Sequence, residues 1–319
     1  MARKKLLTEN QQIKKRKWKK EQIFAFIVAS VPLVGFIVFN GFPLLISFIG
    51  MFSNVDLYDL TNIQWNNFEG FKSVFIPGHA YELFYFDLSK YFYKALIITV
   101  WIASAQLVTL AIALLIATLL HQKPKGAKMF QILFFVPYIC STVAVSLMWR
   151  WMFASDGGIL NAILGTNIDW LRDPSTITWT IIAAVIWQAP GYGIVMFKAA
   201  LDAINPALYE ASEIDGANAW KQFWHITIPS VSPTTFYLLF ASVLTGLTMF
   251  DRATLMAPVS WTQTAGYKDM GLTLMYYVYI LGTQRMEMEL ASVVSIVLFV
   301  VTLTLSVIIM KKRNEKVEG

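Results

Sequence analysis

The sequence has few charged residues, a single cysteine and three histidines. Asp, Glu, Lys and Arg make up only 14% of its 319 residues, whereas a soluble globular domain contains about a quarter. This shortage excludes an ordinary soluble protein, because so few charges cannot cover the surface of a chain this long. The lone Cys140 excludes a disulfide framework within the chain and leaves too few thiolates for a structural zinc site. We therefore expect no metal site, and lipid as the solvent for much of the chain.

Long apolar runs are what the sequence has in abundance. About 20 helical residues cross a bilayer, and six runs of this order contain no Asp, Glu, Lys or Arg: Ile23–Ile49, Ala95–Leu120, Met129–Trp149, Pro174–Phe197, Ile226–Phe250 and Leu290–Met310. In lipid every backbone amide needs an internal partner, so such runs are helices. We predict an all-α membrane protein with six transmembrane helices. Prolines within the runs should kink these helices without ending them. These prolines are Pro32, Pro43, Pro137 and Pro190.

Basic residues indicate the orientation of the spans. The first twenty residues contain nine Lys and Arg, and segments that would share their side of the membrane bring that side to 18 basic and 8 acidic residues. Positive flanks are retained in the cytoplasm, so we expect both termini there. The basic tail is then a topology signal and not a nucleic-acid site. The first run exceeds the roughly 7 to 15 apolar residues of a cleaved signal, which predicts an uncleaved anchor.

This topology divides the chain into five parts. They are a basic cytoplasmic tail (1–22), the first transmembrane helix (23–49), an extracytoplasmic loop (50–94), a core domain (95–310) and a short cytoplasmic tail (311–319). The first outer loop is a candidate docking surface, with acidic residues Asp56, Asp59, Glu69, Glu82 and Asp87. The second outer loop, 154–173, should contain a turn that opens a short helix. The apolar stretch 271–282 is too short to cross, so it should be re-entrant or interfacial.

The inner segment 201–229 has the most unusual pattern in the chain. From Glu210 it reads EASEIDGANAWKQFWHITIP. Pro206 suits the first turn of a helix, and Gly216 suits a turn that needs a left-handed backbone. The pattern predicts helix, turn, helix. Such a segment could be a rigid knob on which a soluble motor pushes, or a solvated connecting loop.

This segment resembles the EAA motif of permease subunits of binding-protein-dependent ABC importers, with Ser212 in place of the second Ala. The resemblance extends over roughly 93–310. The stretches FFVPYICSTVAVSLMWRWMF (134–153), GGILN (157–161) and IWQAPGYGIVMF (186–197) are similar to the first permease of maltose-type carbohydrate systems, such as the lactose, multiple-sugar and glycerol-phosphate permeases. The resemblance implies the type I permease fold of ABC importers, in a prokaryotic cytoplasmic membrane.

The resemblance also implies partners. These are a second homologous permease, a pair of ABC ATPase subunits, an extracytoplasmic solute-binding protein and membrane lipid, with no nucleic acid. Glu210 would pair with a basic residue of the ATPase, and Gly216 would form the elbow of the coupling helix. The ATPase-coupling residues would be Glu210, Ala211, Ser212, Asp215, Gly216 and Ala217. The chain has no G-x-x-x-x-G-K-[ST] phosphate loop, so we expect no catalytic residue and no cofactor of its own, with ATP and Mg on the partner ATPase.

Aromatic faces and a few amide or carboxyl groups are what a saccharide site needs. Candidates on the fourth to sixth spans are Trp187, Gln188, Tyr192, Phe250, Asp251, Arg252, Tyr276 and Tyr277. For each aromatic residue, packing or a place at the membrane interface is the alternative. Gln188 lies inside a span beside a proline, so its amide should need a partner. We expect the transported solute to be a carbohydrate, an oligosaccharide in particular.

Asp251 and Arg252 are ionisable residues at membrane depth, where such residues face a cavity or each other. Similar permeases commonly have Phe-Asp here, but Arg252, the missing Gly-rich stretch before Pro258 and Glu289 at a usual Gly position depart from the pattern. Two interpretations stay open: a structural ion pair, or a pore-facing Arg252 for an anionic solute such as an acidic oligosaccharide or glycerol phosphate. An ion-coupled secondary transporter would need buried carboxylates or histidines in its spans, and a membrane enzyme would need a clustered acid, base or metal set. The six runs contain no Asp, Glu or His, and therefore neither the buried titratable groups of such a transporter nor the clustered set of such an enzyme.

Overall fold

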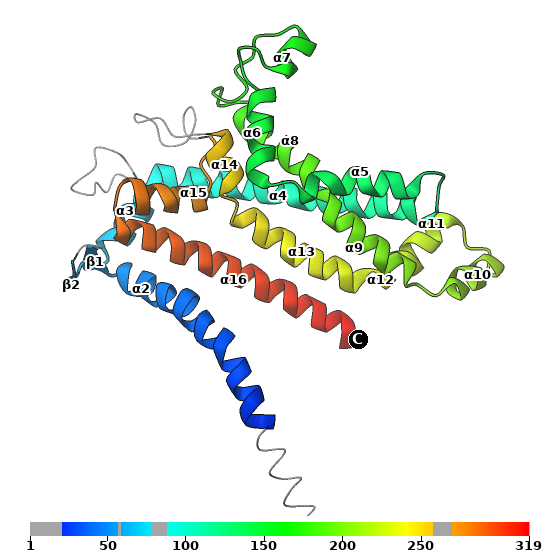
Figure 1. Cartoon of the computed structure of the whole chain (residues 1–319), viewed down its shortest axis with the longest axis horizontal. Helices are drawn as coiled ribbons and strands as arrows, with labels where there is room; N and C mark the ends of the chain where they lie inside the picture. The colour runs from blue at the N-terminus through cyan, green and yellow to red at the C-terminus, as the bar shows by residue number, and fades with distance from the viewer. Residues whose placement is uncertain (1–20, 57–58, 78–87, 258–269, 319) are drawn as a thin grey trace, which may run out of the picture.

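The computed structural model describes residues 21–56, 59–77, 88–257 and 270–318, which form a long bundle of helices (Figure 1). The predicted all-α membrane fold is confirmed, because five helices are long and apolar enough to cross a membrane, with up to six spans if a bent pair of helices is counted as one. The five are Glu21–Gly50, Leu88–His121, Ile177–Asp202, Ser232–Met256 and Met288–Arg313. The predicted tail up to residue 20, together with Glu82, Asp87 and Pro258, lies outside the described residues.

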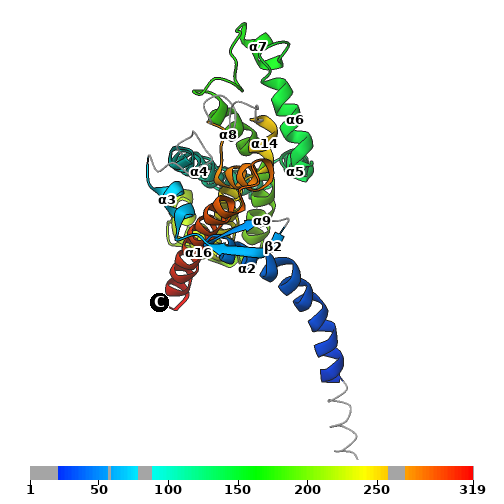
Figure 2. The same ribbon diagram turned by 90° about the vertical axis from the view of Figure 1, so that its left-hand side faces the viewer.

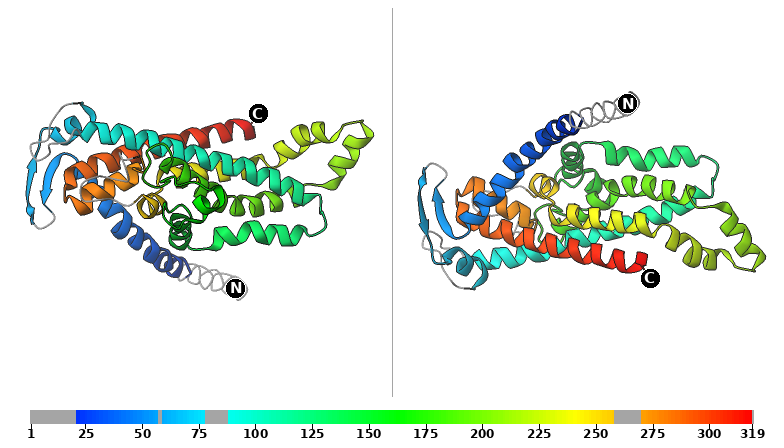
Figure 3. Two further views of the ribbon diagram at one scale, coloured as in Figure 1. Left: turned by 90° about the horizontal axis from the view of Figure 1, so that it is seen from above. Right: turned by 90° about the horizontal axis from the view of Figure 1, so that it is seen from below.

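The first span diverges from the rest of the bundle (Figure 3). It contains a π-helical turn, Ile37–Gly41, and ends in α2 (Phe42–Gly50), which packs on α16 (Met288–Glu318). After α2 the chain forms a small antiparallel hairpin that the all-α prediction did not include. Its strands are β1 (Ser53–Asp56) and β2 (Asp59–Trp65), and α3 (Glu69–Phe75) follows. The segment predicted as the first outer loop therefore contains two strands and a helix.

Helix α4 (Leu88–His121) is the central helix of the bundle. It contacts α8 (Ile177–Gln188), α9 (Pro190–Asp202) and α13 (Ser232–Leu247). Small side chains are buried along its packed side: Ala95, Ala105, Ala113 and Ala117. Small residues let helix backbones approach closely, which is how membrane helices gain packing energy in lipid.

One span is broken, and a second is interrupted. The predicted span Met129–Trp149 is not one continuous helix: α5 (Ala127–Ile139) and α6 (Thr142–Met152) meet at an angle of 95°. Pro137 lies inside α5, and the backbone at Cys140 is extended, so the chain breaks there instead of kinking. Helix α13 ends at Leu247, and after three residues α14 (Asp251–Met256) continues the same span. Helices α8 and α9 form one span, because Ala189 between them has helical backbone angles and its amide donates to the Val185 carbonyl.

The second outer loop has the predicted turn and short helix. Gly157 has φ +66°, and α7 (Ile159–Leu164) begins two residues later. Helices α6 and α7 project from the bundle on the side opposite the first span (Figure 2). The Asn161 side chain fixes the loop, because it bonds the backbone of Ile168 and the Trp170 indole. At the loop's end the Ser175 hydroxyl and amide donate to the Asp173 carboxylate, which lowers the pKa of Asp173.

The remaining short elements lie at the two ends of the bundle. One end has the hairpin, α3 and α15 (Leu274–Tyr279), which continues into a π-helical turn, Ile280–Gln284. Helix α15 is short, as predicted for 271–282, and it packs between α4 and α16. The opposite end has α10 (Pro206–Ile214), α11 (Ala219–Gln222), a second π-helical turn (Phe223–Thr227) and α12 (Ile228–Ser230). The predicted coupling segment and the first outer loop therefore lie at opposite ends of the spans.

Candidate functional site

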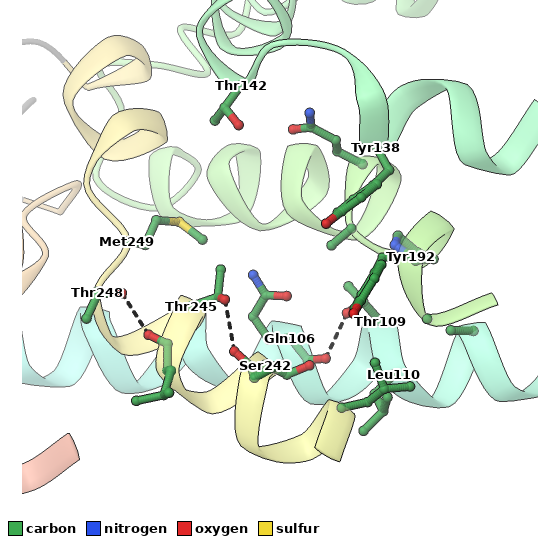
Figure 4. A pocket seen from close by; sticks show the side chains of 18 of the residues that line it. Gln106, Thr109, Leu110, Tyr138, Thr142, Tyr192, Ser242, Thr245, Thr248 and Met249 are labelled. Carbon is green, nitrogen blue, oxygen red and sulfur yellow. Dashed lines mark hydrogen bonds between the residues drawn. The ribbon is translucent and has the colours of Figure 1, made fainter. Parts of the chain in front are cut away.

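A cavity of about 630 Å³ lies between α4 and residues of the α5–α6 pair, α8–α9 and α13–α14. Thr142 beside the α5–α6 break and Thr248 at the α13–α14 interruption line it. Non-helical backbone at membrane depth is tolerated where it lines such a polar space. The volume is within the range of small-molecule sites, which is about 300 to 1,000 Å³. Figure 4 shows its side chains converging from both sides.

Three tyrosines line one part of the cavity. The rings of Tyr138 and Tyr192 are stacked, with centroids 5.4 Å apart and planes 22° from parallel. The hydroxyl of Tyr192 lies 3.2 Å from that of Tyr237 on α13, so one donates to the other. This arrangement offers apolar ring faces together with hydroxyls, which suits the apolar and polar faces of a sugar. The sequence identified Tyr192 as a candidate and gave no reason to select the other two.

Three threonine hydroxyls of the cavity wall are bonded to their own helices. Thr109, Thr245 and Thr248 donate to backbone carbonyls one turn earlier, at 2.8 to 2.9 Å. Their oxygens remain able to accept hydrogen bonds from a ligand. Gln106 points into the cavity from α4 (Figure 4) and is buried. These residues were not among the candidates, although polar side chains at helical spacing within apolar runs are the signal that could have found them.

Gln188 has the partners that its position in a span requires. Its Nε2 donates to the Cys140 carbonyl at the α5–α6 break, at 3.0 Å, and its Oε1 accepts from Nη2 of Arg252 at 2.5 Å. Gln188 is only 2% exposed and Arg252 only 9% exposed. One amide on α8 thus connects the α5–α6 break, through Cys140, to α14, through Arg252.

Asp251 and Arg252 do not form the ion pair that was one interpretation of the sequence. Among the described residues, ion pairs within 4.0 Å join Glu69 to Lys72, and Asp202 to both His121 and Lys198. Asp251 is exposed and Arg252 is buried, and both line the cavity.

Not all of the candidate substrate residues reach the cavity. Gln188, Tyr192, Phe250, Asp251 and Arg252 line it. The other three do not. Trp187 packs edge-on against Trp149, with ring centroids 5.8 Å apart. Tyr276 and Tyr277 are each 1% exposed and belong to the apolar core around α15.

The predicted coupling segment is a helix, a glycine turn and a second helix. Helix α10 starts at Pro206, and the Asn205 side chain caps it by accepting from the Ala207 amide at 3.0 Å. Gly216 has φ +74°, as its place after the helix predicted. The amides of Gly216 and Ala217 donate to Glu213 and Ser212 carbonyls, which is the Schellman ending of a helix. Asn218 caps α11 in the same way as Asn205 caps α10.

Two hydrogen bonds join α10 to the following helix. The Tyr209 hydroxyl lies 2.9 Å from the Thr227 hydroxyl, and Gln222 Nε2 donates to the Ser212 hydroxyl at 3.0 Å. Thr227 is buried, in the π-helical turn that leads to α13. Ser212 is therefore more than a small residue that replaces Ala. We call these two hydrogen bonds the brace.

The tip of the segment is exposed. Ile214 is 88% exposed, and Trp220 on α11 is 69% exposed. Glu210, Ala211, Asp215 and Gly216 are exposed beside them, and Ala217 is half-buried. An apolar surface with carboxylates at its edge is typical of a protein contact. Within the described residues, no three His, Cys, Asp or Glu side chains gather to hold a metal ion.

Sequence comparisons give a family match and several relatives. Residues 109–316 match the sequence model of the binding-protein-dependent transport system inner membrane component family. The arabinooligosaccharides transport system permease protein AraP of Bacillus subtilis is 29% identical, over 88% of this chain and 85% of AraP. The lactose permease protein LacF of Rhizobium radiobacter is 32% identical, over 62% and 68%. The sn-glycerol-3-phosphate permease protein UgpA of Agrobacterium fabrum is 30% identical, over 63% and 68%.

Comparison of folds gives a similar protein of known structure. A chain of a bacterial ABC transporter involved in the import of the acidic polysaccharide alginate superposes with a TM-score of 0.73 at 22% identity, covering 94% of this chain and 99% of the other. A second structure, of the alginate transporter in complex with an alginate pentasaccharide-bound periplasmic protein, gives a TM-score of 0.72 at 22% identity, covering 92% and 93%. At this identity the likeness concerns the fold.

Proposed function

The chain belongs to the binding-protein-dependent transport system inner membrane component family, and from this membership we propose that it is the permease subunit of an ATP-driven carbohydrate importer. A solute-binding protein delivers an oligosaccharide from outside. A second homologous permease completes the pathway, and a pair of ABC ATPase subunits binds and hydrolyses ATP on the cytoplasmic side. The relatives AraP, LacF and UgpA are named for arabinooligosaccharides, lactose and glycerol phosphate, which favours a saccharide or a related polyol phosphate.

The braced coupling segment is the observation that supports this proposal most directly. It projects from the bundle at the end opposite the hairpin (Figure 1), and its tip exposes the apolar side chains of Ile214 and Trp220. ATP-driven closure of the ATPases would move this segment, and the spans would switch between inward-open and outward-open arrangements about the cavity. Glu210 pairs with a basic residue of the ATPase, and Gly216 is the elbow. Both termini are then cytoplasmic, which thiol labelling of single-cysteine variants from each side measures.

The cavity supplies a saccharide site in this scheme. The stacked Tyr138 and Tyr192 provide ring faces for a pyranose, and the threonine oxygens accept bonds from its hydroxyls. Polar groups placed in a largely apolar pocket fix the orientation of a ligand. Trp187, Tyr276 and Tyr277 do not belong to this site.

Uptake by the assembled importer tests the proposal. We expect uptake of a labelled oligosaccharide into proteoliposomes to require ATP and the binding protein, and to stop with vanadate, which traps ABC ATPases. Addition of a protonophore should leave it unchanged. Uptake that resists vanadate and stops with the protonophore would instead indicate an ion-coupled transporter.

The brace gives a prediction of its own. Tyr209→Phe removes one hydroxyl and leaves the volume, and a neutral hydrogen bond is worth about 1 kcal/mol. We expect solute imported per ATP hydrolysed to fall about two- to fivefold while the ATPases still bind. Thr227→Val should lower the ratio at least as much, because it removes this bond and the bond from Thr227 to the Gln222 carbonyl, and the double variant should be no worse than Thr227→Val.

Tyr93→Phe is the matched control for this prediction. It removes the same atom from a tyrosine at the other end of the bundle, whose hydroxyl donates to the Phe75 carbonyl at 3.1 Å. Its ratio should equal that of the parent. Simple addition of the Tyr209→Phe and Thr227→Val effects would show that the two hydroxyls do not act together.

A further inference from the structure

The guanidinium of Arg252 is a buried charge at the wall of the cavity. Arg252 is the second residue of α14, is 9% exposed and lines the cavity. Arginine stays ionised inside proteins, so burial does not remove its charge. A buried charge is costly unless an opposite charge and hydrogen-bond acceptors surround it.

The described residues supply only some of the hydrogen-bond acceptors that the Arg252 guanidinium needs, and no anionic group in direct contact with it. Nη2 donates to the neutral amide oxygen of Gln188, and the buried Nε has no acceptor among them. No carboxylate of the described chain pairs with the guanidinium within 4.0 Å. Asp251, the one carboxylate among the residues lining the cavity, is exposed. The described part of the chain therefore supplies no anionic acceptor.

Gln188 fixes where that acceptor would bind. Its Nε2 is held by the Cys140 carbonyl, so its Oε1 is the end of the amide that faces Arg252. The guanidinium is thus held on one edge by a neutral partner. Its planar fork of donors matches the geometry of a carboxylate or a phosphate.

We propose that Arg252 binds an oxyanion, a carboxylate or a phosphate, on the transported saccharide, with Gln188 as the residue that positions it. The inference rests on the proposed function, because it concerns the solute that the importer carries. The solute occupies the cavity with sugar rings against the tyrosines and its anionic group against Arg252. The oxyanion provides the directly bonded anionic partner that the described residues do not, since the neighbouring Asp251 carboxylate lies beyond 4.0 Å.

Paired solutes test the inference in the assembled importer. In each pair a neutral oligosaccharide is compared with the same compound bearing a carboxylate or a phosphate at C6: galactobiose with digalacturonate, and maltose with maltose 6′-phosphate. We expect uptake of an acidic member by the parent, and the preferred pair identifies which oxyanion is bound. Arg252→Gln should raise KM for that solute by about tenfold or more. Uptake of the neutral member should change little, and Arg252→Lys should be intermediate, because it keeps the charge without the fork.

Each remaining outcome overturns the inference. If the parent transports only neutral members, Arg252 is no anion receptor and the proposed function stands. If Arg252→Gln lowers both members of a pair equally, at equal abundance in the membrane, the residue is structural. If no member is transported by an importer with its ATPases and binding protein assembled, the proposed function fails as well. Should Arg252→Gln not fold, the KM of Arg252→Lys for the two members decides alone.

Discussion

Glu210→Lys is expected to abolish most uptake while leaving the chain folded and inserted. In the proposed complex the Glu210 carboxylate pairs with a basic residue of the ATPase in a partly desolvated contact, and reversing one charge of such a pair opposes two cations. We expect uptake, and the ATP hydrolysis that loaded binding protein stimulates, to fall by about 30-fold or more. Proteoliposome uptake and phosphate release measure the two quantities.

The fold around Glu210 makes this effect local. Helix α10 is fixed by the Asn205 cap at its start and by the Gly216 turn at its end, and Glu210 is exposed between them. Glu213→Lys is the matched control, since it makes the same charge change at another exposed position of the helix. It should retain uptake to within about threefold, as expected for a solvated charge. Unchanged uptake and hydrolysis in Glu210→Lys would remove Glu210 from the ATPase contact.

Features with a local physical cause were predictable from the sequence. The long apolar runs predicted the spans, because lipid leaves a helix as their only solution. Pro206 and Gly216 predicted the coupling segment, because each has one backbone preference that its position requires. A hydrogen-bond partner for Gln188 was predictable for the same kind of reason, because a polar amide inside a span must be satisfied within the protein.

Features that depend on distant parts of the chain were not predictable. Gln188 bonds residues 48 and 64 positions away, and no sequence pattern states which carbonyl or guanidinium will meet it. The sequence predicted a kink at Pro137, but the helix breaks at Cys140. Pro137 alone does not indicate that neighbouring helices and a cavity will accommodate an open turn, so the break was not predictable. Tyr138 and Tyr237 lie in two different apolar runs and converge only in the fold. Tyr276 and Tyr277 are of a residue type that suits a sugar site, but both side chains are buried in the apolar core.

Gly246 on α13 is another residue whose role appears only in the fold. A Cβ at this position would lie 2.7 Å from the Cα and 3.0 Å from the Cβ of Ala103 on α4. The obstacle is backbone, which cannot rotate away, so Gly246→Val must push the two helices apart. Overpacking of this kind costs about 1 to 3 kcal/mol or more. Helix α4 also contributes Gln106 and Thr109 to the cavity.

We therefore expect Gly246→Val to lower both the thermal stability of the solubilised protein and its uptake, the latter by at least about fivefold through loss of folded protein. Gly35→Val is the matched control, because Gly35 lies in the first span and a Cβ there would meet no atom of a neighbouring element within 4 Å. It should melt at the parent temperature and transport at the parent rate. Equal melting temperatures for the two variants would mean that α13 can retreat from α4 at no cost. The contact between Gly246 and Ala103 would then contribute little to stability, and the cavity wall that α4 and α13 share would not require a glycine at this position.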